Sequence, residues 1–368
     1  MKFTVERETL LKPLQAVQGV VERRQTLPIL ANVLLSGQDG VLSVTATDME
    51  LELVASTALE MEASGETTVP ARKLVEICRS LPAGANVTFS VEKDRAVVRS
   101  GRSRFTLATL PAAEFPTFDP QAVETELTVP EGSLKRVIEL TQYAMAQQDV
   151  RYYLNGLLLE ISGHQLRAVA TDGHRLALAD VGFEGAAVES RALIVPRKGV
   201  TELQRLLGSG DAPVRMGLAP NQVRIDLPEL RFTSKLIDGK FPEYERVIPQ
   251  AERCDKQLVI DREQLRQALS RASILSNDKY RAIRLSLESN LLRLVASNPE
   301  QEQAEDELEV AYEGDSLEIG FNVSYLIDAL NSLPAEMARL HLMDSSSSCL
   351  ITPAEADDCQ YVVMPMRL

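Results

Sequence analysis

The residues of this sequence that could do chemistry lie in one short segment, residues 171–176 (TDGHRL). Asp172 and His174 are two positions apart, and a carboxylate beside an imidazole could serve as general acid and base. The segment recurs at 47–50 (TDME) without the histidine, and at 298–299 (NP) without the aspartate as well. A carboxylate repeated in a turn more simply accepts hydrogen bonds from the N–H groups of that turn. We therefore expect a structural turn, and an enzyme that uses Asp172 and His174 remains the alternative.

Other catalytic and cofactor signatures are absent from the sequence. It has no GxxxxGK[ST] phosphate loop and no GxSxG nucleophile elbow. Its 3 histidines and 4 cysteines show neither i, i+4 nor CxxC spacing, which argues against a zinc site and a disulfide scaffold. No apolar run approaches the roughly 20 residues of a membrane-spanning helix. We expect reduced thiols, no metal, no cofactor, no membrane association and a cytoplasmic protein.

The elements that must position this segment repeat three times along the 368 residues. Three landmarks recur at a spacing of about 125 residues, which is typical of repeated domains. The landmarks are 43–55, 167–179 and 293–304; then 67–82, 193–208 and 319–334; then 104–118, 231–245 and the shortened 360–368. The repeats predict three domains of one fold, at 1–124, 125–252 and 253–368.

Each copy has the same internal order of helices and strands. Apolar residues at helical spacing predict a first helix per copy (7–20, 131–146, 261–274) and a second (70–81, 196–207, 322–333). Alternating or apolar segments such as 156–161, 166–171 and 175–181 predict strands. Two helices and roughly eight strands per copy predict an α+β domain whose helices pack on antiparallel sheets.

The net charge is -14, from 39 basic and 53 acidic residues. That total argues at first against a nucleic-acid binder, because an anionic body repels DNA. The charge is unevenly divided, however. The six predicted helices hold 13 basic and 8 acidic residues, so they sum to +5 while the rest of the chain sums to −19. Lys and Arg also favour solvated helix faces, so the excess alone leaves both interpretations open.

Opposite charges gather in the first and the third copy. Residues 95–104 (RAVVRSGRSR) carry four arginines and no acid, whereas 300–309 (EQEQAEDELE) carry six acids and no base. Such patches suit a head-to-tail contact between two copies of the chain. Repeated contacts of this kind close into a ring when the rotation between neighbouring copies allows it. Two unrelated solvated charge runs are the alternative.

Several long strings resemble the bacterial DNA polymerase III beta subunit family, the replicative sliding clamps. The resemblance runs from Met1 to Leu368. It implies a head-to-tail homodimer of three-domain protomers, closed into a six-domain ring with helices lining the hole and sheets outside. It also implies that the ring encircles double-stranded DNA and confers processivity on a polymerase. The strings are MKFTVERETLLKPLQAV (1–17), TLPIL (26–30), QDVRYYLNG (148–156), TDGHRL (171–176), VPRKG (195–199) and YVVMPMRL (361–368).

The resemblance gives the uneven charge a function. Basic helices facing phosphates hold DNA without reading its sequence, and an acidic exterior repels DNA from everywhere but the hole. Ordinary core packing is the alternative for the Tyr152-Tyr153 pair. The positions that match DNA contacts of the family are Arg24, Gln148, Arg151, Tyr152, Tyr153, Arg197 and Lys198.

The resemblance also implies a hydrophobic pocket for short peptide motifs, between the second and third domains and the C-terminal strand. Expected partners are the polymerase III catalytic subunit, the clamp loader, other DNA polymerases and repair factors. Methionine and proline in such a pocket permit several partners. Ser346 is less apolar than this implies. The matching positions are Leu154, Thr171, Gly173, His174, Arg175, Leu176, Pro242, Arg246, Val247, Ser346, Val362 and Met364.

At the dimer contact, the resemblance places apolar residues of the first domain against apolar residues of the partner's third domain. Charged residues of opposite sign would face each other around them, and these rim pairs are individually weak. The apolar group is Phe105 and Leu107 against Ile274 and Leu275, and the charged group is Lys73, Arg102 and Arg104 against Glu300, Glu302 and Glu305.

Overall fold

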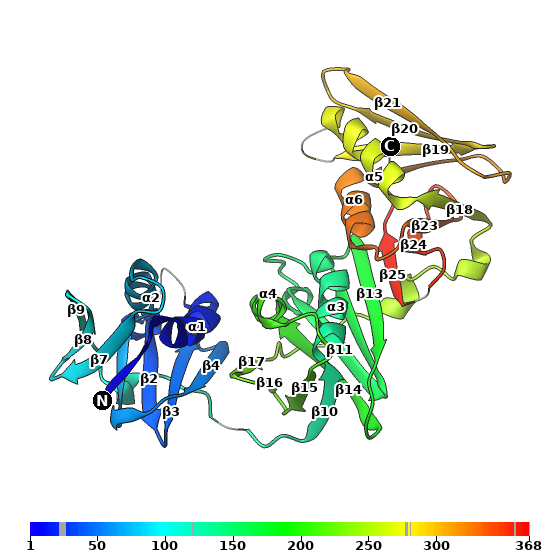
Figure 1. Cartoon of the computed structure of the whole chain (residues 1–368). Helices are drawn as coiled ribbons and strands as arrows, with labels where there is room; N and C mark the ends of the chain where they lie inside the picture. The colour runs from blue at the N-terminus through cyan, green and yellow to red at the C-terminus, as the bar shows by residue number, and fades with distance from the viewer. Residues whose placement is uncertain (22–26, 120, 277–278, 280, 357, 368) are drawn as a thin grey trace. The chain divides into compact units, whose positions relative to one another are not determined.

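The computed structural model describes residues 1–21, 27–119, 121–276, 279, 281–356 and 358–367. The chain divides into two compact units, each built of helices and antiparallel sheets (Figure 1). No helix within these described ranges is long and apolar enough to cross a membrane. The first unit comprises Met1–Val129, Arg205–Leu207 and Ala212–Leu236, and the second comprises Pro130–Gln204, Gly208–Asp211 and Ile237–Leu368.

The six predicted helices are confirmed, two in each copy of the repeat. The first helix of every copy ends earlier than predicted, because its last turn is a 3₁₀ segment. The helices and their 3₁₀ extensions are α1 (Arg7–Val17) with η1 (Gln18–Val20), α2 (Ala71–Ser80), α3 (Glu131–Thr141) with η4 (Gln142–Ala144), α4 (Arg197–Leu206), α5 (Arg262–Ala272) with η8 (Ser273–Leu275) and α6 (Val323–Ser332).

The strands also follow the predicted order. The first copy contains β1 (Lys2–Glu6), β2 (Asn32–Gln38), β3 (Val41–Thr47), β4 (Leu51–Ala58), β5 (Met61–Ala63), β6 (Gly65–Pro70), β7 (Asn86–Glu92), β8 (Arg95–Ser100) and β9 (Ser103–Ala108). The second contains β10 (Thr125–Pro130), β11 (Gly156–Gly163), β12 (Gln165–Thr171), β13 (Arg175–Gly182), β14 (Val188–Pro196), β15 (Pro213–Leu218), β16 (Gln222–Leu227) and β17 (Leu230–Lys235). The third contains β18 (Lys256–Asp261), β19 (Ala282–Glu288), β20 (Leu291–Ser297), β21 (Gln303–Glu309), β22 (Leu317–Asn322), β23 (Met337–Leu342), β24 (Cys349–Pro353) and β25 (Cys359–Val363).

Most of these helices begin directly where a strand ends. Pro70 and Pro130 cap α2 and α3, and proline fixes the backbone φ for the entry into a helix while it needs no N–H partner. The third copy uses side chains instead. Asp261 accepts the N–H of Gln264 at 2.8 Å, and Asn322 caps α6 in the same manner. The strand-to-helix corner is therefore kept throughout the repeat, with proline caps in the first two copies and side-chain caps in the third.

The helices bury their apolar stripes on the sheets. In the first unit, α1 packs on β3 and β4 and against α2, burying Leu10, Leu14 and Val17. In the second unit, α3 packs on β12 and β13, while α5 packs on β20 and β21 and against α6 (Figure 1). All four cysteines are buried free thiols. Burial raises the pKa of both the Cys78 and the Cys359 thiol to about 11.

Two of the sheets continue from one copy of the repeat into the next. One has the order β10-β15-β16-β17-β4-β3-β2-β6, and the other has the order β14-β11-β12-β13-β25-β24-β23-β18. At the first junction β17 pairs with β4, with Phe232 opposite Leu53; at the second β25 pairs with β13, with Tyr361 opposite Ala177. The remaining sheets, β5-β1-β7-β8-β9 and β21-β20-β19-β22, stop within a copy and leave β9 and β21 as edge strands.

Candidate functional site

The turn between β12 and β13 contains the segment 171–176, in which the sequence suggested possible acid–base chemistry. The backbone N–H groups of His174 and Arg175 donate to Oδ1 of Asp172 at 2.9 and 3.1 Å. Nε of Arg175 donates to the other carboxylate oxygen at 3.0 Å. In the first copy, two backbone N–H groups donate to Oδ1 of Asp48 at 2.9 and 2.7 Å. The prediction of a turn-capping carboxylate is confirmed, and Asp172 has its oxygens engaged rather than poised for proton transfer.

Arg151 is seated beside the same turn. Its guanidinium donates to both carboxylate oxygens of Asp149, at 3.0 and 2.8 Å, and to the carbonyl oxygen of Asp172 at 3.1 Å. The bonds from Arg151 lower the pKa of Asp149 to about 2. Gly173 has a φ of +87°, and a Cβ there would lie 2.9 Å from Nη1 of Arg151. The glycine thus makes room for the guanidinium as well as for the turn.

Arg175 lies in an almost closed cage. Its side chain is 13% exposed, and its guanidinium lies 5.2 Å from the ring centroid of Tyr143 and 4.7 Å from that of Tyr325. It donates to the carboxylates of Asp172 and Asp328 and, at 2.9 Å, to the carbonyl of Tyr143. Burial alone would lower the pKa of Arg175, but the two acidic partners raise it. Arg175 therefore ties β13 to α6 and has little capacity left for a ligand.

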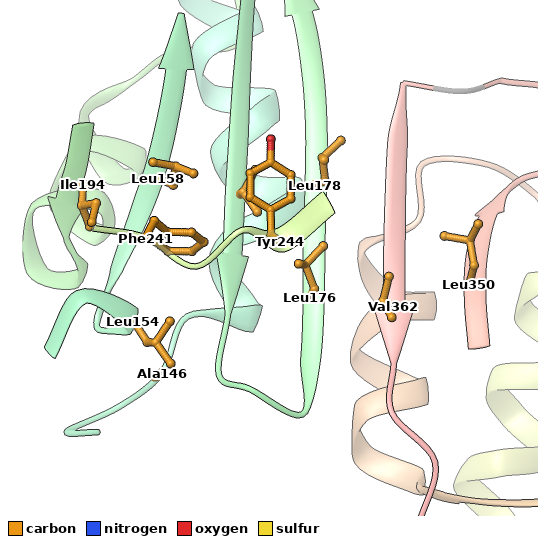
Figure 2. Packing of buried hydrophobic residues seen from close by; sticks show 11 residues of the cluster. Ala146, Leu154, Leu158, Leu176, Leu178, Ile194, Phe241, Tyr244, Leu350 and Val362 are labelled. Carbon is orange, nitrogen blue, oxygen red and sulfur yellow. The ribbon is translucent and has the colours of Figure 1, made fainter. Parts of the chain in front are cut away.

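Three of the predicted pocket residues lie together in one buried apolar cluster of the second unit. Leu154, Leu176 and Val362 are each at most 2% exposed, and Leu176 lies opposite Val362 in the β13–β25 pairing. Figure 2 shows them with their neighbours from β11, β14, β24 and the segment that contains Phe241 and Tyr244. The cluster comprises Ala146, Leu154, Leu158, Val169, Leu176, Leu178, Ile194, Phe241, Tyr244, Leu350 and Val362.

Other predicted pocket residues lie at the surface around this cluster. Val247 and Met364 are 43% and 37% exposed, so apolar side chains stay in contact with solvent there. The N–H of Met364 donates to the carbonyl of His174 at 2.9 Å, which ties the end of β25 to the Thr-Asp turn. Pro242 and Arg246 are exposed as well. Apolar side chains are therefore exposed at the surface next to the buried apolar cluster.

Thr171, His174 and Ser346 have local structural partners. The hydroxyl of Thr171 donates to the carbonyl of Arg175 at 2.7 Å, and the His174 ring stacks on Tyr325 at 6.3 Å between centroids. The N–H and the hydroxyl of Ser346 both donate to Oδ1 of Asp344, at 2.8 and 2.7 Å. Ser346 thus closes a turn, which accounts for a polar residue at this position.

Two aromatic residues that were not among the predicted site residues, Phe241 and Tyr244, complete the cluster. Their segment, 241–244 (FPEY), repeats 115–118 (FPTF) of the first copy, which was the available signal. The hydroxyl of Tyr244 donates to Glu160 and accepts from Arg167, which also pairs with Asp180. Tyr244 is therefore held by polar bonds at one end while its ring packs in the cluster.

The predicted DNA-contacting residues that the structure describes fall in the second unit. Tyr152 is 57% exposed, whereas Tyr153 packs against the apolar cluster, and their rings meet edge to face at 5.8 Å. Nη1 of Arg197 donates to the carbonyl of Met145 at 2.9 Å. Gln148 has a φ of +53° at the start of the loop, and Lys198 follows Arg197 on α4. Arg24 lies outside the described residues.

Val150 is an exposed apolar residue that was not among the predicted site residues. It is 96% exposed and stands between Gln148 and Tyr152 in the loop of the predicted DNA contacts. Its neighbours in the sequence were singled out because they match DNA-contacting positions of the family, and an apolar side chain offers no group that binds phosphate or stacks on bases.

Part of the positive charge counted on the helices is already paired within the chain. Arg136 of α3 lies 2.6 Å from Asp358, and Arg271 of α5 lies 2.7 Å from Asp306. The sum of +5 from the sequence therefore overstates the charge that these helices offer to a phosphate backbone. These pairs are exposed, so their contribution to stability is small.

The predicted contact residues at the two edge strands are placed as follows. On the β9 side, a shallow hollow of about 560 Å³ is lined by Lys73, Ile77, Arg104, Phe105 and Leu107, among others. Arg102 lies in the exposed turn before β9. On the β21 side, Ile274 of η8 is 77% exposed and Leu275 is partly exposed. Glu300, Glu302 and Glu305 lie in or just before β21, and Glu305 is 3.0 Å from Arg293.

No group of three or more His, Cys, Asp or Glu side chains that could hold a metal occurs among the residues that the structure describes. The oxygen-rich ligand sets that hard cations require are therefore not assembled in those parts of the chain.

Comparison with known proteins agrees with this architecture over the whole length. The chain matches family models of the DNA polymerase III beta subunit: its N-terminal domain over residues 1–119, its central domain over 128–243 and its C-terminal domain over 245–367. It is 54% identical over 369 residues to the beta sliding clamps of Pseudomonas aeruginosa and of Escherichia coli, covering 100% of each chain.

Solved structures agree as well. The DNA polymerase III subunit beta of P. aeruginosa superposes with a TM-score of 0.97 at 54% identity, with 100% of both chains covered. A sliding clamp of the same organism, bound to griselimycin, has the same TM-score and identity. By its repeated α+β domains, its sheet order and its full-length similarity, the chain belongs to the DNA polymerase III beta subunit family.

Proposed function

We propose that this protein is a sliding clamp: two protomers join head to tail around duplex DNA, and the ring tethers a DNA polymerase to it. The chain's family is one of non-catalytic processivity factors, so the enzyme alternative is withdrawn. One observation supports the ring most strongly. Sheets run across both junctions between the repeats of the chain, whereas β9 in the first repeat and β21 in the third are left as edge strands. We retain the domain boundaries 1–124, 125–252 and 253–368 and a cytoplasmic location as parts of this proposal.

The two junctions within the chain supply a template for a third between protomers. In the repeat, β9 is the counterpart of β17 and β25, while β21 is the counterpart of β4 and β13. Since β17 pairs with β4 and β25 with β13, we expect β9 of one protomer to pair with β21 of the other. The pairing would join the five-stranded and the four-stranded sheet into one continuous sheet and cover two exposed edges.

The template also gives the register of that contact. Leu53 and Ala177 lie opposite Phe232 and Tyr361, and their counterpart in the third copy is Ala304. Phe105 is then expected opposite Ala304 of the partner, and Arg104 opposite Glu305. Opposite charges facing each other across a pair of strands stabilise it modestly and exclude the wrong register.

Retention on DNA would be topological, with a weak electrostatic attraction inside the ring. Arg151, Arg197 and Lys198 carry positive charge and Tyr152 has an exposed ring, and none of these groups requires a particular base. Several of them already have partners within the chain, which favours loose contacts. A ring held in this way can slide, because no contact fixes its position along the duplex.

The apolar cluster around Leu176 and Val362 supports a docking site for short peptides at its exposed edge. Val247 and Met364 would form the contact surface, and a flexible thioether accommodates anchors of different shape. We expect the polymerase III catalytic subunit, the clamp loader, other DNA polymerases and repair factors to compete for this site. The P. aeruginosa relative bound to griselimycin shows that a clamp of this family accepts a ligand.

The test of the proposed function is a run-off experiment. The protein is loaded on nicked circular DNA by a clamp loader, and the DNA is then linearised at moderate salt. A topological clamp remains on the circle and leaves the linear molecule through its ends. Equal retention on both forms would overturn the proposal, because a protein bound by contacts alone does not respond to free ends.

A further inference from the structure

The two junctions within the chain contain an ion pair at the same place of the repeat. At the first junction, Lys12 of α1 pairs with Glu229. At the second, Nη2 of Arg136 of α3 lies 2.6 Å from Oδ2 of Asp358. Both cations are the sixth residue of their helix, and both carboxylates stand directly before the last strand of the following copy, β17 or β25. We call this contact, from the first helix of one copy to the next copy, the clasp.

The sheets place both carboxylates of the clasp in the same way. The carbonyl oxygen of Glu229 accepts the N–H of Ser56 at 2.9 Å. The carbonyl oxygen of Asp358 accepts the N–H of Asp180, also at 2.9 Å. Each of these bonds continues the strand pairing of its junction, β17 with β4 and β25 with β13. The same pairing at a third junction, between β9 and β21 of two protomers, would therefore place the residue before β9 against the first helix of the partner's third copy.

The two clasp positions of that third junction hold different residue types. The sixth residue of α5 is Gln267, and the residue directly before β9 is Arg102. The helix side has no charge here, and the strand side carries a cation in place of a carboxylate. A lysine or arginine on the helix would repel that cation, whereas the amide oxygen of a glutamine accepts a hydrogen bond from a guanidinium. The two residues are therefore a compatible pair without being an ion pair.

The surroundings of Gln267 leave its amide oxygen for such a contact. Nε2 of Gln267 donates to Oε1 of Glu263 at 2.7 Å, so the acceptor end of the amide points away from that carboxylate. Both oxygens of Glu263 also accept from Arg266, at 2.8 and 2.6 Å. Gln267 and Arg102 are both exposed in the single chain, so a partner can reach either of them.

We propose that Gln267 and the partner's Arg102 form the clasp between protomers, as a neutral hydrogen bond in place of an ion pair. This contact rests on the proposed clamp function, because it requires β9 to pair with β21 of the partner. The peptide chain runs through the other two junctions, so a ring can open only between protomers. The neutral clasp thus lies at the junction that opens, and the residue at position 267 sets how firmly that junction is closed.

The test changes only the charge at position 267. Gln267→Glu places a carboxylate against the partner's Arg102, and Gln267→Lys places a second cation there. We expect the dissociation constant of the full-length dimer to fall about fivefold for Gln267→Glu and to rise about fivefold for Gln267→Lys, because the ring contains two such exposed contacts. The constant is measured by sedimentation of dye-labelled protein over a dilution series. Gln264→Glu is the matched control, since it makes the same change one turn earlier on α5, at another exposed position.

Effects on α5 itself act in the opposite direction. Glu263 lies four residues before position 267, so it attracts the lysine of one variant and repels the glutamate of the other. A change in helix stability therefore cannot produce the expected order of dissociation constants, and the unfolding midpoints of both variants report this effect separately. In the Arg102→Ala background, the two variants should dimerise equally.

Several results would overturn the proposal. They are equal dissociation constants for the two variants, the reverse order, a difference that persists in the Arg102→Ala background, and a fivefold tighter dimer of the Gln264→Glu protein. Normal run-off of the unaltered protein together with any of these results would concern the clasp alone. Failure of the unaltered protein to run off linearised DNA would instead concern the clamp function.

Discussion

Removing the apolar residues of η8 should separate the proposed dimer. Ile274 is 77% exposed in the single chain, so a partner that covers it would take most of this side chain out of water. Full burial of such a side chain stabilises an interface by about 2 kcal/mol, and the partly exposed Leu275 adds about 1 kcal/mol. A closed ring of two protomers contains this contact twice, so the loss comes to about 6 kcal/mol.

A loss of this size raises the dissociation constant of the dimer by a factor of roughly 10⁴. We predict that a protein carrying Ile274→Ala and Leu275→Lys sediments as a monomer at micromolar concentration, whereas the unaltered protein sediments as a dimer. Val150→Ala is the matched control, because Val150 is even more exposed yet lies outside both edges. A stable dimer of the double variant would refute the assignment of η8 to the interface.

Three further predictions concern single contacts. Arg104→Glu or Glu305→Arg alone should weaken the dimer, and the two substitutions together should restore the dimer that is measured by sedimentation. A double variant that dimerises as weakly as the single variants would contradict the proposed register. Arg175→Ala should cost about 3 kcal/mol, because it leaves the largely buried carboxylate of Asp172 without its ion-pair partner, and should lower the midpoint of thermal unfolding by several degrees; an unchanged midpoint would show that the cage contributes nothing. Burial raises the pKa of Glu52 in the folded state, so the unfolded chain loses this proton first and Glu52 should reduce stability as the pH rises through and above 4.5. The difference in unfolding midpoint between the Glu52→Gln protein and the unaltered protein should therefore grow over that range. A difference that stays constant would contradict this prediction.

The architecture was predictable because it repeats. Each helix and strand of one copy has a counterpart about 125 residues away, so a weak pattern in one copy is supported by a strong pattern in another. The corresponding turn of the third copy, at Asn298-Pro299, is the exception. There Gln301 adds a residue with a φ of +65°, and Asn298 accepts the N–H of Glu302 instead of the N–H groups two and three positions on. A one-residue insertion in a turn changes no hydrophobic pattern, so the sequence did not reveal it.

The contacts of the sites were less predictable than the positions of their residues. Arg175 was expected to face a ligand, but Tyr143 and Tyr325 enclose it, and the latter is 150 positions away in the sequence. Pairs such as Arg136 with Asp358 change the effective charge of a helix surface in the same manner. Long-range pairing of this kind depends on how the copies meet, which local composition does not encode. Most of the site residues remain predictions that the proposed experiments address.

The turn beside Arg151 also occurs in the first copy of the repeat, so the two copies can be compared at the position of Gly173. Met49 occupies the position of Gly173 in the first copy, with a φ of +75°, so this backbone tolerates a bulky side chain. In the second copy, the absence of a side chain at Gly173 leaves room for the guanidinium of Arg151. A Cβ at Gly173 would lie 2.9 Å from Nη1 of Arg151. Any side chain at position 173 would therefore displace the guanidinium of Arg151 from Asp149 and from the carbonyl of Asp172, and so loosen the loop that carries Tyr152.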